Sequence, residues 1–172
     1  SFLRGASRPE ELAARAHELG YAALAITDEC SLAGVVRAHL AAKGLGLKLL
    51  IGTEVALADG PKLVLLACDR EGYGNLSQLV TRGRTRGRKG SYRLTRADLD
   101  GGLDACLALL VPGAAPDTAH ARWVAERFPA RAWIAAGLHC GPDDRARLAA
   151  LRELAAAAGL PLVAAGDVHM HV

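Results

Sequence analysis

The sequence predicts an α/β protein, and three observations favour this fold class. Apolar strands and amphipathic helices alternate along most of the 172 residues. Acidic or imidazole side chains follow directly after several of the strands. Aromatic residues are only 4% of the chain, which favours helices packed on a sheet over a β-sandwich. Because alternating strands and helices form parallel sheets, we expect a mainly parallel sheet with right-handed crossovers.

Capping and turn residues mark the elements in the first part of the chain. Ser7 and Glu10 form a capping box that begins the first helix, and Gly20 ends it. Ser31 caps the second helix, and a turn over 58–61 leads from the second strand into the third. This part is therefore predicted to contain helices over 8–19 and 32–43, and strands over 21–27, 48–55 and 63–67.

The remaining elements follow from the same signals. Tyr73, Leu76 and Leu79 lie on one face of a predicted helix, Thr95 caps a short helix, and Gly159 ends the last one. The predicted helices here cover 71–82, 96–99, 117–128 and 142–158, and the predicted strands cover 105–111, 133–138 and 162–165.

Candidate functional side chains gather at the carboxyl ends of the predicted strands. They are Asp28, Glu29, Glu54, His139, Asp167, His169 and His171. In an extended segment alternating residues point the same way, so Asp167, His169 and His171 are expected to face one cavity unless a turn follows His169. Functional groups at the ends of several strands favour a barrel over an open sheet.

Length, composition and cysteine content limit the class of protein. The chain is long enough for one domain, expected over 1–172, with a single core. No apolar run approaches the roughly 18–20 residues that span a bilayer, and no signal peptide opens the chain, so we expect no membrane partner. The four cysteines are far apart in the sequence and form no CxxC motif, which indicates reduced thiols and a cytoplasmic protein.

One segment is strongly basic. Between Gly72 and Ala97 there are seven basic residues and no acid, whereas the rest of the chain has 14 basic and 18 acidic residues. The candidate nucleic-acid-binding residues are Arg82, Arg84, Arg86, Arg88 and Lys89, which are expected on a loop over 82–89. Such a loop is suited to bind polyanions. A solvated, mobile loop is the alternative interpretation.

Several stretches together resemble the polymerase-and-histidinol-phosphatase (PHP) domain of bacterial C-family DNA polymerases. The matching stretches are 1–7, 25–34, 50–55, 62–67, 71–76 and 166–169, in the family's order. Residues 28–31 and 167–172 look more like the error-prone branch than the main replicative one. The resemblance implies a distorted seven-stranded (β/α)7 barrel, here incomplete because the chain starts after the first, His-x-His strand.

The resemblance also implies a metal site at the carboxyl ends of the strands. Family members hold up to three ions, typically zinc, manganese or iron, that activate water for phosphoester hydrolysis, including 3′→5′ exonuclease activity. Glu54 matches the bridging carboxylate, Asp167 and His169 match the final ligand pair, and Asp28 remains as a further candidate ligand. His139 is a candidate at the rim that matches no position of the family motif.

Other positions depart from the family pattern. Arg4 replaces an aspartate, Glu29 replaces a histidine, and Lys62 replaces another histidine. A fixed cation disfavours a metal at the same place, and a catalytic zinc needs at least three protein ligands. We therefore expect a degraded site in which Arg4 or Lys62 pairs with Glu54 or Asp167, without robust nuclease activity. The alternative is a zinc or manganese ion held by Glu54, Asp167 and His169.

The resemblance implies that the chain is part of an error-prone DNA polymerase acting in DNA repair and translesion synthesis. The expected partners are DNA, the remaining polymerase domains and translesion accessory proteins. No residue that catalyses nucleotidyl transfer is expected within this chain, so its own role is expected to be structural. The alternatives are a free-standing metal-dependent phosphoesterase or exonuclease, and a nucleic-acid-binding module without catalysis.

Overall fold

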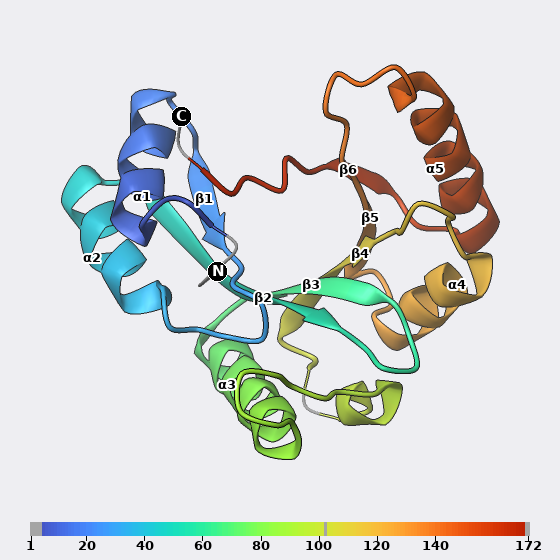
Figure 1. The fold of residues 1–172 in the computed structure, drawn as a ribbon, viewed down its shortest axis with the longest axis horizontal. Coiled ribbons are helices and arrows are strands. Elements are labelled where there is room, and N and C mark those ends of the chain that lie inside the picture. The colour runs from blue at the N-terminus through green and yellow to red at the C-terminus, as the bar shows by residue number, and fades with distance from the viewer. Residues whose placement is uncertain (1–4, 102, 171–172) are drawn as a thin grey trace.

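Six strands form a single curled sheet in the structure, a computed structural model that describes residues 5–101 and 103–170 (Figure 1). The strand order follows the sequence, β1-β2-β3-β4-β5-β6. Their bounds are β1 Ala23–Ile26, β2 Lys48–Ala56, β3 Lys62–Ala67, β4 Cys106–Val111, β5 Ala132–Ala136 and β6 Leu162–Ala164. All six lie where strands were predicted, within a few residues at each end. Among the described residues, no helix is both long and apolar enough to cross a membrane.

The direction of β3 departs from the predicted parallel order. β1–β2, β4–β5 and β5–β6 are parallel pairs, whereas β3 is antiparallel to both β2 and β4. Only residues 57–61 connect β2 to β3, which is too few for a crossover helix. Within this connection the Leu57 N–H donates to the Pro61 carbonyl at 3.2 Å. The chain must therefore reverse, and β2 and β3 form a hairpin.

The described residues form five α-helices and one 3₁₀ helix around the sheet. They are α1 Pro9–Glu18, α2 Val35–Leu45, α3 Arg70–Arg86, η1 Arg96–Leu99, α4 Thr118–Arg127 and α5 Asp144–Ala158. The N-cap of α1 is Arg8, not the predicted Ser7, and its backbone N–H donates to the Glu11 carboxylate at 2.6 Å. α2 begins three residues later than predicted, after Gly34.

Helix α3 corrects the prediction of a basic loop. The helix runs on to Arg86, so Arg82, Arg84 and Arg86 are helical and only Arg88 and Lys89 follow it. Gly83 allows close packing of this part of the helix, because a Cβ atom there would lie 3.0 Å from Leu94 Cγ and 3.2 Å from Cys30 Sγ. The helix therefore packs closely beside the end of β1.

The two faces of the sheet have different surroundings. Alternate residues Leu63 and Leu65 of β3 are buried in the main hydrophobic core, which continues through residues of α3, α4 and α5. The intervening Val64 and Leu66 line a cavity on the opposite, inner face. Figure 1 shows the helices outside the curled sheet, and the segment after β6 runs back across the opening towards α1. The inner face therefore carries the candidate site.

Candidate functional site

A cavity of about 690 Å³ lies on the inner face of the sheet. Five of the predicted site residues line it, namely Asp28, Glu54, His139, Asp167 and His169. Glu29 and Lys62 do not line this cavity. Arg4 and His171 lie outside the described residues, so their predicted places at the rim are not described. The ends of separate strands thus bring five of the candidates to one cavity.

The parallel pairing of β1 and β2 continues as a bridge between Glu29 and Glu54, which brings the backbone of Asp28 beside that of Glu54. Past the last paired strand residues, the Glu54 N–H donates to the Asp28 carbonyl at 3.2 Å, and the Cys30 N–H donates to the Glu54 carbonyl at 2.7 Å. The hydroxyl of buried Thr53 also donates to the Asp28 carbonyl, at 2.8 Å. These hydrogen bonds therefore hold the backbone of Asp28 and Glu54 in place.

The Asp28 carboxylate fits closely over Gly34. A Cβ atom at position 34 would lie 2.7 Å from Asp28 Oδ2 and 3.2 Å from Pro9 Cγ. Real Cβ atoms do not approach an oxygen so closely, so any side chain at this position would displace the carboxylate or α1. The glycine at the start of α2 therefore makes room for Asp28.

Lys62 pairs with Glu54 across the β2–β3 hairpin. The Lys62 Nζ and Glu54 Oε2 atoms are 2.8 Å apart. Lys62 is the strand partner of Ala56, which places it diagonally opposite Glu54 on one face of the sheet. Only 11% of the Glu54 side chain is exposed, against 31% for Lys62. This ion pair is one of those expected from the sequence, and it neutralises the most buried carboxylate of the cavity.

Asp167 and His169 lie close together at the opposite side of the cavity. Their Oδ1 and Nε2 atoms are 3.6 Å apart. Asp167 has a φ angle of +46°, so the segment is not extended there and the predicted strand-like alternation is wrong. The His169 carbonyl accepts from the Ala6 N–H at 2.9 Å, which ties this segment to the residues before α1.

Glu29 belongs to a different network, on the side of α3. Its Oε1 atom accepts from the Tyr92 hydroxyl at 3.1 Å, and the same hydroxyl accepts from the Ala56 N–H at 2.9 Å. Burial, opposed by the Ala56 hydrogen bond and reinforced by the Glu29 charge, raises the pKa of Tyr92 to about 12. Glu29 therefore does not take the place in the cavity that a histidine ligand would need.

Arg84 completes this network. It donates to the carbonyls of Glu29 at 2.9 Å and Cys30 at 3.0 Å, and its guanidinium stacks 5.4 Å from the centre of the Tyr92 ring. Sequence reasoning missed Tyr92, which is 63 residues from Glu29 along the chain. Arg84 was also predicted to bind nucleic acid, which stays a prediction; in the structure Arg84 donates to backbone carbonyls of the segment after β1.

The residues present do not fit a multinuclear metal centre. Among residues 5–101 and 103–170, no group of three or more His, Cys, Asp or Glu side chains is arranged to hold an ion. Glu54 is engaged by the Lys62 ammonium, and within the described residues the ion-pair partner of Asp167 is His169. A zinc site needs three or four convergent ligands.

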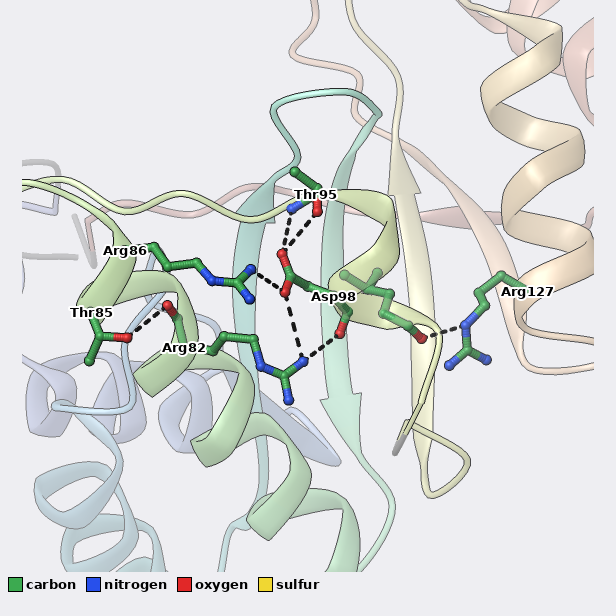
Figure 2. A network of polar contacts seen from close by, with 7 residues as sticks. Arg82, Thr85, Arg86, Thr95, Asp98 and Arg127 are labelled. Atoms are coloured by element: carbon green, nitrogen blue, oxygen red, sulfur yellow. Dashed lines mark hydrogen bonds and ion pairs between the residues drawn. The ribbon is translucent and has the colours of Figure 1, made fainter.

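A second polar cluster lies outside the cavity, between α3 and η1. Figure 2 shows Arg82 and Arg86 reaching from α3 towards Asp98 of η1. The distances from Asp98 Oδ1 to the Nη1 atoms of Arg86 and Arg82 are 2.5 Å and 3.8 Å. Asp98 was not among the predicted site residues, although its spacing from Thr95 is that of a capping box.

Comparison with known proteins relates the chain to polymerases. It is 62% identical over 177 residues to the error-prone DNA polymerase of Dechloromonas aromatica, covering 100% of this chain and 17% of that protein. It is 60% identical over 179 residues to the error-prone DNA polymerase of Aromatoleum aromaticum, covering 99% and 17%. The chain thus spans about one sixth of the length of these curated relatives.

Solved structures share the fold at low sequence identity. An amidohydrolase from Chromobacterium violaceum, with bound sulfate and no metal, has a TM-score of 0.68 and 19% identity, covering 97% of this chain and 84% of the other. A candidate metal-dependent phosphoesterase from Bifidobacterium adolescentis has a TM-score of 0.65 and 16% identity, covering 96% and 84%. These likenesses show the fold alone.

The family itself is shown by sequence. The sequence profile of the PHP domain matches residues 1–133, which is more than three quarters of the chain. The chain therefore belongs to the PHP domain family.

Proposed function

We propose that this chain is the PHP domain of an error-prone DNA polymerase that synthesises DNA past damaged template. The identity to two such polymerases, at 60% or more over nearly all of the chain, supports this proposal. Because the chain covers only 17% of their length, the residues that transfer nucleotides are placed in other domains. Those domains and DNA are the proposed partners, together with translesion accessory proteins.

Within that polymerase, the proposed role of the domain is structural and independent of metal. The observation that carries this proposal is the ion pair of Lys62 with Glu54, which supplies positive charge to the carboxylate that would otherwise bridge two ions. An ammonium at 2.8 Å from a carboxylate opposes metal binding both by charge and by occupying the space. Hydrolysis of phosphoesters by a metal-activated water is therefore not proposed for this domain.

The proposed fold of the complete domain is a (β/α)7 barrel. β1 and β6 are the two outer strands of the sheet order, and both lie at the opening beside the cavity. A seventh strand between them would pair with both edges and cover the apolar inner face. Limited proteolysis tests this point, since a polypeptide that includes the preceding residues should resist cleavage near β1 better than residues 1–172.

The polymerase proposal is tested by primer extension with the full-length protein. The protein should copy an undamaged template strand, and it should also extend the primer past an abasic site in a damaged one. A Lys62→Met variant should retain extension, because the domain contributes no catalytic group. If the protein extends no primer but hydrolyses phosphate esters in a chelator-sensitive reaction, the phosphoesterase alternative replaces this proposal.

A further inference from the structure

The seven basic residues of the segment identified in the sequence differ in how neighbouring groups engage their side chains. Arg84 is engaged with backbone carbonyls beside β1, and Arg96 stacks 5.0 Å from the ring centre of Trp123. The other five basic side chains are all exposed. We call these five residues the basic ridge, which consists of Arg82, Arg86, Arg88, Lys89 and Arg93.

Asp98 orients two arginines of the ridge. Its side chain is only 5% exposed, and its Oδ2 atom accepts from the Thr95 N–H at 2.9 Å and the Thr95 hydroxyl at 3.0 Å. Oδ1 faces both arginines, and Arg82 Nη1 also donates to the Asp98 carbonyl at 3.2 Å (Figure 2). The arginine side chains nevertheless remain 43% and 53% exposed, and each guanidinium carries five N–H donors. Ordered donors therefore remain directed to solvent.

The turn after α3 carries the other three cations, Arg88, Lys89 and Arg93. The Ser91 N–H and hydroxyl both donate to the Arg88 carbonyl at 2.9 Å. The Arg93 N–H donates to the Gly83 carbonyl at 3.0 Å, which folds the turn back against the helix. Among the described residues, Arg88, Lys89 and Arg93 have no acidic partner within ion-pair distance. Five cations thus share one buried carboxylate, which leaves a formal charge of +4 on the ridge.

We infer that the basic ridge binds the phosphate backbone of DNA without reading its sequence. Exposed guanidinium groups at fixed spacing bind phosphates in bidentate fashion and release counterions. The aromatic side chain nearest in sequence, Tyr92, has its ring under Arg84 and its hydroxyl in hydrogen bonds, so it is not available to stack on a base. This inference rests on the proposed polymerase function, because it takes the polymerase's own DNA as the ligand.

The experiment uses the full-length protein and a fluorescent primer–template duplex, with the dissociation constant measured over a range of salt concentrations. A ridge variant combines Arg88→Ala, Lys89→Ala and Arg93→Ala, which remove exposed side chains only. A matched control combines Arg122→Ala, Arg145→Ala and Arg152→Ala, which removes the same charge from exposed positions of α4 and α5. Each phosphate contact contributes about 0.9 to the slope of log affinity against log salt concentration.

The ridge variant should reduce the magnitude of the salt slope by about 2 to 3, and the control by less than about 1. Equal slopes for wild type, ridge variant and control would overturn the inference. If the ridge instead faces an acidic surface of a neighbouring domain, the slope stays unchanged and the unfolding temperature of the ridge variant falls, which also overturns it. Primer extension by wild type is scored separately, so its absence would count against the polymerase proposal and not against the ridge.

Discussion

Lys62 and Glu54 face each other because their strands are antiparallel, and this local geometry determines what the cavity can bind. A two-residue diagonal offset across a hairpin puts the ammonium on the same face as the carboxylate. The ammonium lies against the charge of a nearly buried carboxylate. One residue of β3 therefore sets the charge beside Glu54.

A double-mutant cycle tests the energy of this pair. Lys62→Met and Glu54→Gln should each destabilise the chain, and the double variant should be more stable than the sum of the two effects predicts. Because Lys62 is about one-third exposed, we expect a coupling energy of about 1 kcal/mol from urea unfolding. A coupling energy near zero would show that the ion pair between Lys62 and Glu54 does not stabilise the fold.

Gly34 and Gly44 provide a matched test of the position of Asp28. Gly34→Ala places a Cβ atom against the Asp28 carboxylate and should cost about 1–3 kcal/mol of unfolding free energy. Gly44→Ala, in the same helix with open space around it, should instead stabilise by about 0.5–1 kcal/mol. If both substitutions shift the urea midpoint in the same direction, the close fit of Asp28 over Gly34 is wrong.

The positions of polar residues at the ends of predicted strands identified residues of the cavity, but they did not predict the direction in which every side chain points. Asp28, Glu54, Asp167 and His169 line one cavity because Glu54 lies near the end of β2 and the others follow strands of the same sheet. Glu29 also follows a strand, yet a tyrosine hydroxyl from a distant segment accounts for its carboxylate. No local signal in the sequence indicates a contact between residues so far apart.

At the scale of elements, Arg84 links α3 to the end of β1. Arg84→Ala removes hydrogen bonds to the carbonyls of Glu29 and Cys30, and should cost about 2–3 kcal/mol of unfolding free energy. Arg88→Ala, an exposed change just beyond the same helix, should remain within about 0.5 kcal/mol. Hydrogen exchange of the Cys30 amide should quicken only in the Arg84 variant. Unchanged exchange there would contradict the link.

Asp98 joins η1 to α3, and its contribution should depend on pH. Burial alone would raise its pKa, but hydrogen bonds from Thr95 and the Arg86 charge outweigh it, so the pKa of Asp98 is lowered from 3.8. A lowered pKa means that the charged form stabilises the fold above the unfolded value, and that this contribution is lost as pH falls through the folded value. The pH window therefore lies below about 4.

Asp98→Asn should lower the unfolding free energy by about 1–2 kcal/mol at neutral pH, and this difference should shrink as pH falls below 4. Asp100→Asn, at an exposed position just after η1, serves as the control and should have little effect at any pH. Urea unfolding from pH 7 to pH 3 makes the comparison. A difference that is constant with pH would mean that the Asp98 charge does not contribute.

The positions of the strands could be predicted from the sequence, whereas the direction of β3 and the full length of α3 were not predicted. The apolar runs located all six strands, because alternation and flanking turns identify buried strands well. The turn over 58–61 had too few residues for a crossover helix, a signal that β3 would reverse. The predicted end of α3 was too early, and the close approach of Gly83 to Leu94 and Cys30 is seen only in the folded structure.

The described part of the chain has two distinct surfaces. The inner face of the curled sheet carries an apolar cavity with acids and imidazoles at its rim, and the basic ridge lies on the outside. Between them, Arg84 of α3 donates to the carbonyls of Glu29 and Cys30, in the segment that follows Asp28. The fold is shared with hydrolases of low sequence identity, whereas the near relatives in sequence are polymerases. The likeness to those hydrolases therefore concerns the fold alone.

The metal content of the full-length protein tests the central claim most directly. Protein purified without chelators is analysed by inductively coupled plasma mass spectrometry, beside a variant that combines Asp167→Asn and His169→Ala. With Lys62 paired to Glu54, both proteins should contain the same zinc, manganese and iron, with no ion attributable to the cavity. A stoichiometric ion in wild type that disappears from the variant would contradict the claim.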